Sequence, residues 1–370
     1  MRRDLTLGGA VTVGLAALFL PLGAAGGWLQ HWPALLLWLA SLVAVATLLP
    51  RRLPTGGAAL AAAAAAFLGA VALFLLLAAG ARGAGATGLW LALLALAAIV
   101  WRALERGASW SAAAGSRVIG LAVPMFFGAW ILYLWQLLTV GFGVPEVLLP
   151  APSAIATVTL HSLPIMGEDF VQTFIRSMIP GYVIGCGAGF LVGVLIDRLP
   201  FLQRGLLPIG NFASALPIVG VAPIMVMWFG FDWQSKAAVV VVMTFFPMLV
   251  NTIAGLGALP RIERDLMRTY AASYAQTLAK ARLPAALPFL FNAFKVNSTL
   301  ALIGAIVAEF FGTPIVGMGF RISTSVGRMD IPLVWATIVL AAVTGSTTYG
   351  AIALIERSLT FWHPSFRRAS

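Results

Sequence analysis

Few side chains in this sequence could carry out chemistry, and their spacing matches no catalytic or metal-binding pattern. The single cysteine, Cys186, lies inside an apolar stretch, so no disulfide is expected. The three histidines are far apart in the chain: His31, His161 and His363. A zinc site needs ligands at short spacings, such as two histidines four residues apart. We therefore predict no catalytic residue and no metal ligand.

A nucleotide-binding loop is also absent from the sequence. A P-loop requires Gly-Lys followed by Ser or Thr to hold phosphates and magnesium. The chain has three lysines, and none follows a glycine: Lys236, Lys280 and Lys295. We expect no cofactor in this chain.

Glu309 is the one acidic residue clearly within the late apolar stretches. An ionisable group at such a position is costly in a membrane and suggests a function. It could face a transported substrate, or it could pair with the backbone or with a cation at the adjoining turn. Ser214 and Ser346 supply neutral polar groups on two other apolar stretches, where they could line a pathway or bond between helices.

Prolines interrupt the apolar stretch that contains Ser214. Pro208, Pro217 and Pro223 each remove a backbone donor and bend a helix. Breaks at membrane depth survive where they line a protein-buried cavity or path. A translocation route and ordinary kinked packing both fit this pattern.

The elements that position these residues are long apolar helices. Of 370 residues, 61% are hydrophobic and 9% charged, whereas a globular domain carries roughly 25% charged residues. A bilayer core about 30 Å thick needs ~20 apolar residues per helix. We predict an all-α polytopic membrane protein with ten spans, at about residues 5–26, 33–49, 57–80, 87–103, 118–140, 172–196, 206–229, 237–256, 297–316 and 332–355.

The basic residues predict the orientation in a bacterial inner membrane. If both termini are cytoplasmic, the 23 Lys and Arg residues also fall on the cytoplasmic side, with five exceptions: Arg82, Arg176, Lys236, Arg321 and Arg328. This asymmetry agrees with the positive-inside rule. The outer arginines could attract an anion or anchor to headgroups. The net charge of +11 forms no basic stripe with interleaved aromatics, so lipid and not nucleic acid is the expected partner.

The polar stretch at 104–117 divides the chain into two predicted parts. Residues 1–117 form a four-span extension that includes the alanine run Ala61 to Ala66, which favours close helix packing. No binding constellation occurs there, and its role stays open. Residues 118–370 form six spans with more specific loops.

The longest predicted inside loop, at about 258–296, reads as helical. Leu266, Tyr270, Tyr274 and Leu278 recur every four residues and would share one helical face. Such a helix could lie on headgroups or dock into a groove of another protein. The two prolines of Leu283–Pro288 are expected to end it before the next span.

This loop resembles that of the permease subunit of a type I ABC importer. The family motif reads Glu-Ala-Ala, three residues, Gly, nine residues, Ile, one residue, Leu-Pro. Aligned on Leu283 and Pro284, the chain has Asp265, Leu266 and Met267 at the opening triplet, Ala271 at the glycine and Ala281 at the isoleucine. Only the acidic character and the terminal Leu-Pro match strictly.

The resemblance extends over about residues 118–368 and is closest to the branch that imports nitrate, sulfonates, taurine and thiamine-precursor pyrimidines. Its elements occur in family order: Pro150-Ala151-Pro152-Ser153, then Pro217 and Pro223 before Trp228-Phe229-Gly230, then Ala308-Glu309, Gly317-Met318-Gly319-Phe320 and Trp362-His363-Pro364. The first four spans lie outside it.

The resemblance implies an importer in which two permeases, here expected as a homodimer, form the pathway. Two ATPase chains, which bind ATP and magnesium, would drive transport, and an extracytoplasmic binding protein would deliver a small solute. Residues 265–278 would dock into the ATPase, with Leu266, Tyr270 and Tyr274 on the buried face.

Two other classes of protein compete with this interpretation. An ion-coupled secondary transporter would need intramembrane ionisable residues, of which Glu309 alone fits, and it would leave the Leu-Pro loop unexplained. An intramembrane enzyme would need a nucleophile and base or metal ligands, for which no constellation exists.

Overall fold

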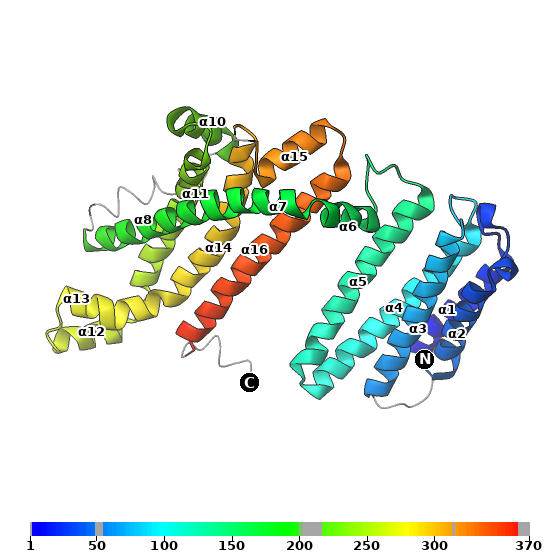
Figure 1. Cartoon of the computed structure of the whole chain (residues 1–370). Coiled ribbons are helices and arrows are strands. Elements are labelled where there is room, and N and C mark those ends of the chain that lie inside the picture. The colour runs from blue at the N-terminus through cyan, green and yellow to red at the C-terminus, as the bar shows by residue number, and fades with distance from the viewer. Residues whose placement is uncertain (1, 49–54, 200, 202–216, 313–314, 362–370) are drawn as a thin grey trace. The chain divides into compact units, whose positions relative to one another are not determined.

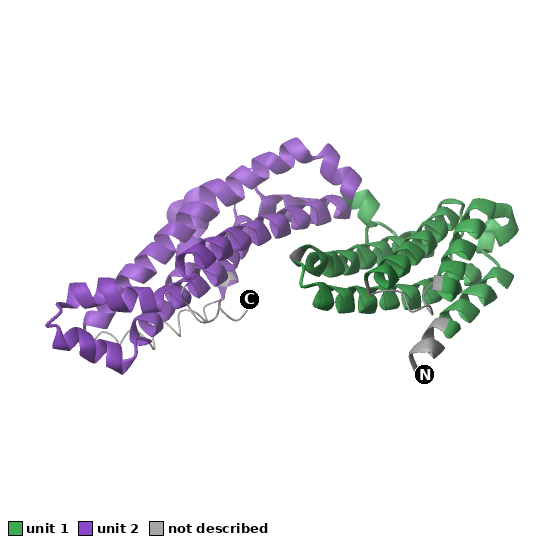
Figure 2. Cartoon of the chain, turned by 90° about the horizontal axis from the view of Figure 1, so that it is seen from below, with its two compact units in different colours: residues 1–155 green, residues 156–370 purple. Residues whose placement is uncertain are grey.

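The computed structural model describes residues 2–48, 55–199, 201, 217–312 and 315–361, and these residues are helical with no strand among them (Figure 1). The chain forms two compact units, Met1–Ile155 and Ala156–Ser370 (Figure 2). The predicted all-α membrane fold is confirmed.

Unit 1 is built on helices that pack through small residues. Its helices are α1 (Arg2–Ala16), α2 (Trp32–Leu48), α3 (Thr55–Ala78), α4 (Thr87–Ala114) and α5 (Arg117–Phe142). Helix α3 packs against both α2 and α4. In the alanine run, Ala62, Ala65 and Ala66 are buried in this core, and the Ser41 hydroxyl donates to the Ala65 carbonyl at 2.8 Å. Alanine side chains thus allow the close approach that the composition predicts.

Unit 2 has α11 (Trp233–Gly257) at its centre, packed between α8 (Ile179–Arg198) and α14 (Leu283–Glu309). The other elements are α6 (Pro152–His161), which begins in unit 1, α7 (Leu163–Phe170), the π-helical η4 (Val171–Met178), α10 (Ile218–Phe229), α12 (Arg261–Thr269), α13 (Tyr274–Thr277), the π-helical η5 (Leu278–Arg282), α15 (Met318–Gly327) and α16 (Ile331–Leu359).

A stripe of glycines brings α8 close to α11. Gly181, Gly185, Gly189 and Gly193 recur every four residues and are buried against α11. A Cβ atom at Gly193 would lie 2.7 Å from the Thr252 side chain, and each of the other three would also meet α11 atoms at clashing distance. Small residues at this contact let the two helix backbones approach closely, as is common between helices in membranes.

Eight helices among the described residues are long and apolar enough to cross a membrane. Two shorter apolar helices, Gly8–Phe19 and Val219–Phe229, fall at the first and seventh of the ten predicted spans. The first predicted span is interrupted because α1 ends at Ala16, and short 3-10 turns then run through Pro21, Gly23 and Gly26. The first part of the seventh predicted span, residues 206–216, lies outside the described residues, and the rest contains α10.

Helix α5 groups with α1 to α4 in the contacts of unit 1. The Tyr133 hydroxyl donates to the Ala70 carbonyl of α3 at 2.9 Å, and the ring of Phe142 stacks on Trp90 with centroids 4.1 Å apart. The division of the chain at residue 117 into an extension and a six-span core stays a prediction.

Candidate functional site: a two-ended helix

The predicted loop helix over 265–278 is two helices, so the prediction of one continuous helical face is wrong. Helix α12 ends at Thr269 and α13 begins at Tyr274. Ser273 starts the second helix: its hydroxyl accepts from the Gln276 N–H at 3.3 Å, and the Gln276 side chain accepts from the Ser273 N–H at 2.9 Å. This capping box redirects the chain, so Tyr274 does not continue the face of Leu266 and Tyr270.

The turn between the two helices is a left-handed cap centred on Ala271, which has φ of 48°. The Ala272 N–H donates to the Met267 carbonyl at 3.0 Å, and the Ala271 N–H donates to the Arg268 carbonyl at 2.9 Å. These two bonds form a Schellman motif, in which glycine is the preferred residue. Ala271 therefore occupies a position whose backbone conformation favours the glycine of the family motif.

Helix α12 presents an apolar row to its surroundings. Ile262, Leu266 and Tyr270 are 82%, 53% and 74% exposed, at a spacing of four residues. Asp265 and Arg268 form an exposed ion pair at 3.7 Å beside this row. Ile262 was missed by the sequence reasoning, although its position four residues before Leu266 could have revealed it. An exposed apolar row on a polar helix suits docking into a groove.

Tyr274 packs within the chain, where it joins an ion pair. Its hydroxyl donates to Asp197 Oδ2 at 3.1 Å, and the Arg198 guanidinium lies 4.9 Å from the centre of its ring. Arg282 binds Asp197 with both guanidinium nitrogens, at 2.5 and 2.6 Å, and donates from Nε to the Leu256 carbonyl at 3.1 Å. We call Asp197, Arg198, Tyr274 and Arg282 the anchor cluster.

The anchor cluster joins three segments that lie far apart in the sequence. Asp197 and Arg198 end α8, Arg282 ends η5, and Leu256, which accepts from Arg282, is near the end of α11. Bidentate arginine–carboxylate pairs fix both distance and orientation. The cluster therefore holds the start of the α13 helix rigidly against α8 and α11.

Leu283 and Pro284 do not end the helix, which corrects the prediction made for Leu283–Pro288. Pro284 lies in the first turn of α14, and Pro288 lies inside it. The Leu283 N–H donates to the Leu278 carbonyl, five residues back, so η5 is a wider π turn. A π turn changes the hydrogen-bond register and accommodates the proline that follows. A helical rod consequently runs from Tyr274 to Glu309.

Glu309 ends this rod in a buried hydrogen-bond cluster. Its side chain is 2% exposed. The Thr173 hydroxyl donates to the carboxylate at 2.8 Å, and the Gly319 N–H donates to it at 2.7 Å. Thr173 in turn accepts from the Met318 N–H at 2.8 Å. Of the two roles that the sequence left open, this geometry favours pairing with the backbone of the adjoining turn.

The turn itself is shaped by two glycines and an ion pair. Gly317 has φ of 137°, which disfavours any other residue, and its N–H donates to Asp169 Oδ1 at 2.8 Å. A Cβ atom at Gly319 would meet Glu309 Cβ at 2.8 Å. Arg321 donates to Asp169 from Nε at 2.8 Å and from Nη2 at 3.1 Å, so two of its guanidinium nitrogens are bonded within the protein.

The other pathway candidates are not brought together with Glu309. Pro217 precedes α10 and is exposed, while Pro223 lies inside α10. Ser346 is exposed on α16. Ser214 lies outside the described residues, as do Pro208 and the Trp362-His363-Pro364 element.

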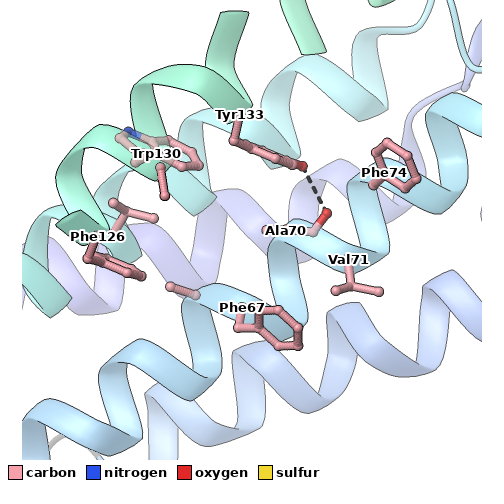
Figure 3. Close-up of a pocket in the computed structure, with 10 residues that line it drawn as sticks. Phe67, Ala70, Val71, Phe74, Phe126, Trp130 and Tyr133 are labelled. Atoms are coloured by element: carbon pink, nitrogen blue, oxygen red, sulfur yellow. Dashed lines mark hydrogen bonds between the residues drawn. The ribbon is translucent and has the colours of Figure 1, made fainter. Parts of the chain in front are cut away.

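An apolar groove lies among the helices of unit 1. It has a volume of about 360 Å³ and is lined by apolar side chains of α3, α4 and α5, including Phe67, Phe74, Phe126 and Trp130 (Figure 3). The hydroxyl of Tyr133, one of the two polar side-chain groups of this lining beside the Trp130 indole N–H, is bonded to the Ala70 carbonyl. Nothing in this lining supplies chemistry.

The fold and its long apolar helices define a multi-span helical membrane protein. Residues 181–361 match the family model of the binding-protein-dependent transport system inner membrane component. The formylaminopyrimidine transport permease of Halalkalibacterium halodurans is 30% identical over 65% of this chain and 95% of its own length.

Two further relatives are also named as transport permeases. The riboflavin transport system permease of Chloroflexus aurantiacus is 29% identical over 67% of this chain and 91% of its own length. The putative aliphatic sulfonates transport permease of Bacillus subtilis is 30% identical over 67% of this chain and 88% of its own length. The chain belongs to the family of ABC importer permeases, as the loop resemblance predicts, and is a multi-pass inner-membrane transport subunit.

Proposed function

We propose that this chain forms the solute pathway of an ATP-driven importer, as one of two identical permeases. Two copies of a separate ATPase, which carries ATP and magnesium, would bind the inner face. A binding protein outside the membrane would deliver the solute. The observation that carries this proposal is the exposed row of Ile262, Leu266 and Tyr270, adjoining a helix that continues through the anchor cluster to Glu309.

The orientation follows from the charge pattern. Both termini and the α12–α13 segment face the cytoplasm in this proposal, because most arginines then lie on that side. The ATPase would meet α12 first, and α13 would pass its movement to α8 and α11 through Asp197 and Arg282. Motif residues Asp265 and Ala271 shape the docking segment, while Leu283 and Pro284 begin its connection to the membrane.

The solute is small in this proposal, because the relatives are named for a pyrimidine, a flavin and sulfonates. Anionic and heterocyclic solutes are the two classes that these names include.

Co-purification with an ATPase encoded beside this chain tests the proposal. Tagged wild type should retain the ATPase, and Tyr270→Glu should lose it, because a charge would enter the apolar contact. Arg261→Glu places the same carboxylate on an exposed residue of α12 outside the apolar row and should retain the complex. If the wild type binds no ATPase, the proposal fails, and ion-coupled transport becomes the function to test.

A further inference from the structure

A polar hollow of about 680 Å³ lies where α7 and η4 approach the turn before α11, away from the anchor cluster. This volume is within the range of roughly 300–1,000 Å³ that small-molecule sites occupy. The hollow is formed by Pro164, Gly167, Glu168, Val171, Gln172, Arg176, Asp232 and Val316. Three of these residues are charged, in contrast to the apolar groove of unit 1.

Gln172 is the unusual residue of this wall. It is 3% exposed, and its Oε1 accepts a long 3.5 Å hydrogen bond from Arg176 Nη1. Its Nε2 has no hydrogen-bond partner in the described part of the chain. A buried donor without a partner is unfavourable, because it has given up its hydrogen bond to water. An acceptor atom of a ligand in the hollow could satisfy this amide after a small side-chain rotation.

The charged groups of the hollow do not suit a simple anion. Glu168 and Asp232 contribute two carboxylates, against the guanidinium of Arg176 in the lining and the buried ammonium of Lys236, whose Nζ donates to the Asp232 carbonyl at 3.0 Å. Asp232 also accepts from the Trp233 N–H at 2.8 Å, which fixes its carboxylate at the start of α11. A sulfonate would therefore meet no excess of positive charge here. A ligand with N–H donors beside an acceptor would find partners for both.

We propose that this hollow is an entry site for an amino-substituted nitrogen heterocycle. A ring nitrogen would accept from Gln172 Nε2, and the adjacent amino group would donate to Glu168 or Asp232. The proposal rests on the importer function and its orientation, which place the hollow on the outer side. It deepens that function, because it favours an aminopyrimidine-like solute over a sulfonate.

The test measures binding to the full-length permease in lipid nanodiscs, without ATPase or binding protein. The probes are 4-amino-2-methylpyrimidine and ethanesulfonate, followed by equilibrium dialysis. We expect the pyrimidine to bind and ethanesulfonate not to bind. Gln172→Leu should weaken pyrimidine binding about fivefold, which is the usual effect of one lost hydrogen bond. Glu168→Gln at the exposed rim should weaken it without risk to the fold.

Glu146→Gln removes a carboxylate from an exposed loop of unit 1 and should leave binding unchanged. The proposal is overturned if wild type does not bind the pyrimidine, if ethanesulfonate binds as tightly, or if both Gln172→Leu and Glu168→Gln keep wild-type affinity. Co-purification of the ATPase with Gln172→Leu separates the two proposals. An intact complex without heterocycle binding removes this site and leaves the importer function standing.

Discussion

Ala271 adopts a backbone conformation that costs free energy for a residue with a side chain. The left-handed region brings Cβ close to the following carbonyl oxygen, at about 1 kcal/mol or more. The Schellman hydrogen bonds from the Ala271 and Ala272 N–H groups offset this cost and end α12 at a defined angle. A single torsion thus sets the direction in which the apolar row of α12 points.

Ala271→Gly should stabilise the α12–α13 turn by about 1 kcal/mol, since glycine pays no Cβ penalty there. Hydrogen exchange of the amides over 266–273 should slow about fivefold. Ala272→Gly is the matched control, because Ala272 has no positive φ and should exchange faster. Equal exchange in wild type and Ala271→Gly would mean that the turn carries no strain.

The Asp197–Arg282 pair is the other residue-level feature with a measurable consequence. Both side chains are largely buried, so Arg282→Ala would leave a carboxylate without its partner, at a cost of about 3 kcal/mol. We expect Arg282→Ala to lower uptake per ATP hydrolysed. The exchanged pair Asp197→Arg with Arg282→Asp should recover part of that ratio. A double variant no better than the single one would show that the pair itself does not transmit movement.

At the scale of elements, α8 is defined by its glycine stripe. The four glycines face α11 at every fourth residue, whereas Gly187, on the same helix, has open space where a Cβ would stand. Small residues at every fourth position are visible in the sequence and could have predicted this contact between helices.

Gly185→Leu should therefore break the α8–α11 contact, because its side chain would enter the space of Val241 and Thr244. Gly187→Leu adds the same side chain toward open space and should be tolerated. We expect the first variant to lose the monodisperse peak in detergent size exclusion, or at least 5 °C of thermal midpoint, and the second to keep both. Similar behaviour of the two variants would place the contact elsewhere.

Some elements could be predicted from sequence, and others could not, for identifiable physical reasons. The number and length of apolar stretches predict the helices, because a bilayer requires them. The helix end predicted at Pro284 is wrong, because the η5 turn accommodates this proline and leaves no pattern in the sequence. Asp197 and Arg282 are separated by 85 residues, so only the fold shows that they meet.

At the scale of the whole molecule, the family match begins at residue 181, so the first four helices lie outside it. Their contacts nevertheless include α5, through Tyr133 and Phe142. The extension is thus packed onto the first helix of the predicted six-span core.

The orientation of the whole chain can be tested with single cysteines in a Cys186→Ala background. Glu263→Cys on α12 should react with a membrane-impermeant maleimide only after the inner face is opened. Glu146→Cys should react in intact cells, because the positive-inside pattern places its loop outside. Labelling of both positions from the same side would contradict the predicted topology.

The helical rod from Tyr274 to Glu309 contains 36 residues and measures about 54 Å at 1.5 Å per residue. One end is fastened to the anchor cluster and the other to the turn at Gly317 and Gly319. In the proposed function such a rod would transmit movement along its length: a tilt of about 5° at one end would displace the other end by roughly 5 Å. Because the rod is long, a small displacement of its cytoplasmic end would become a larger displacement of its outer end, without a change in any one side chain.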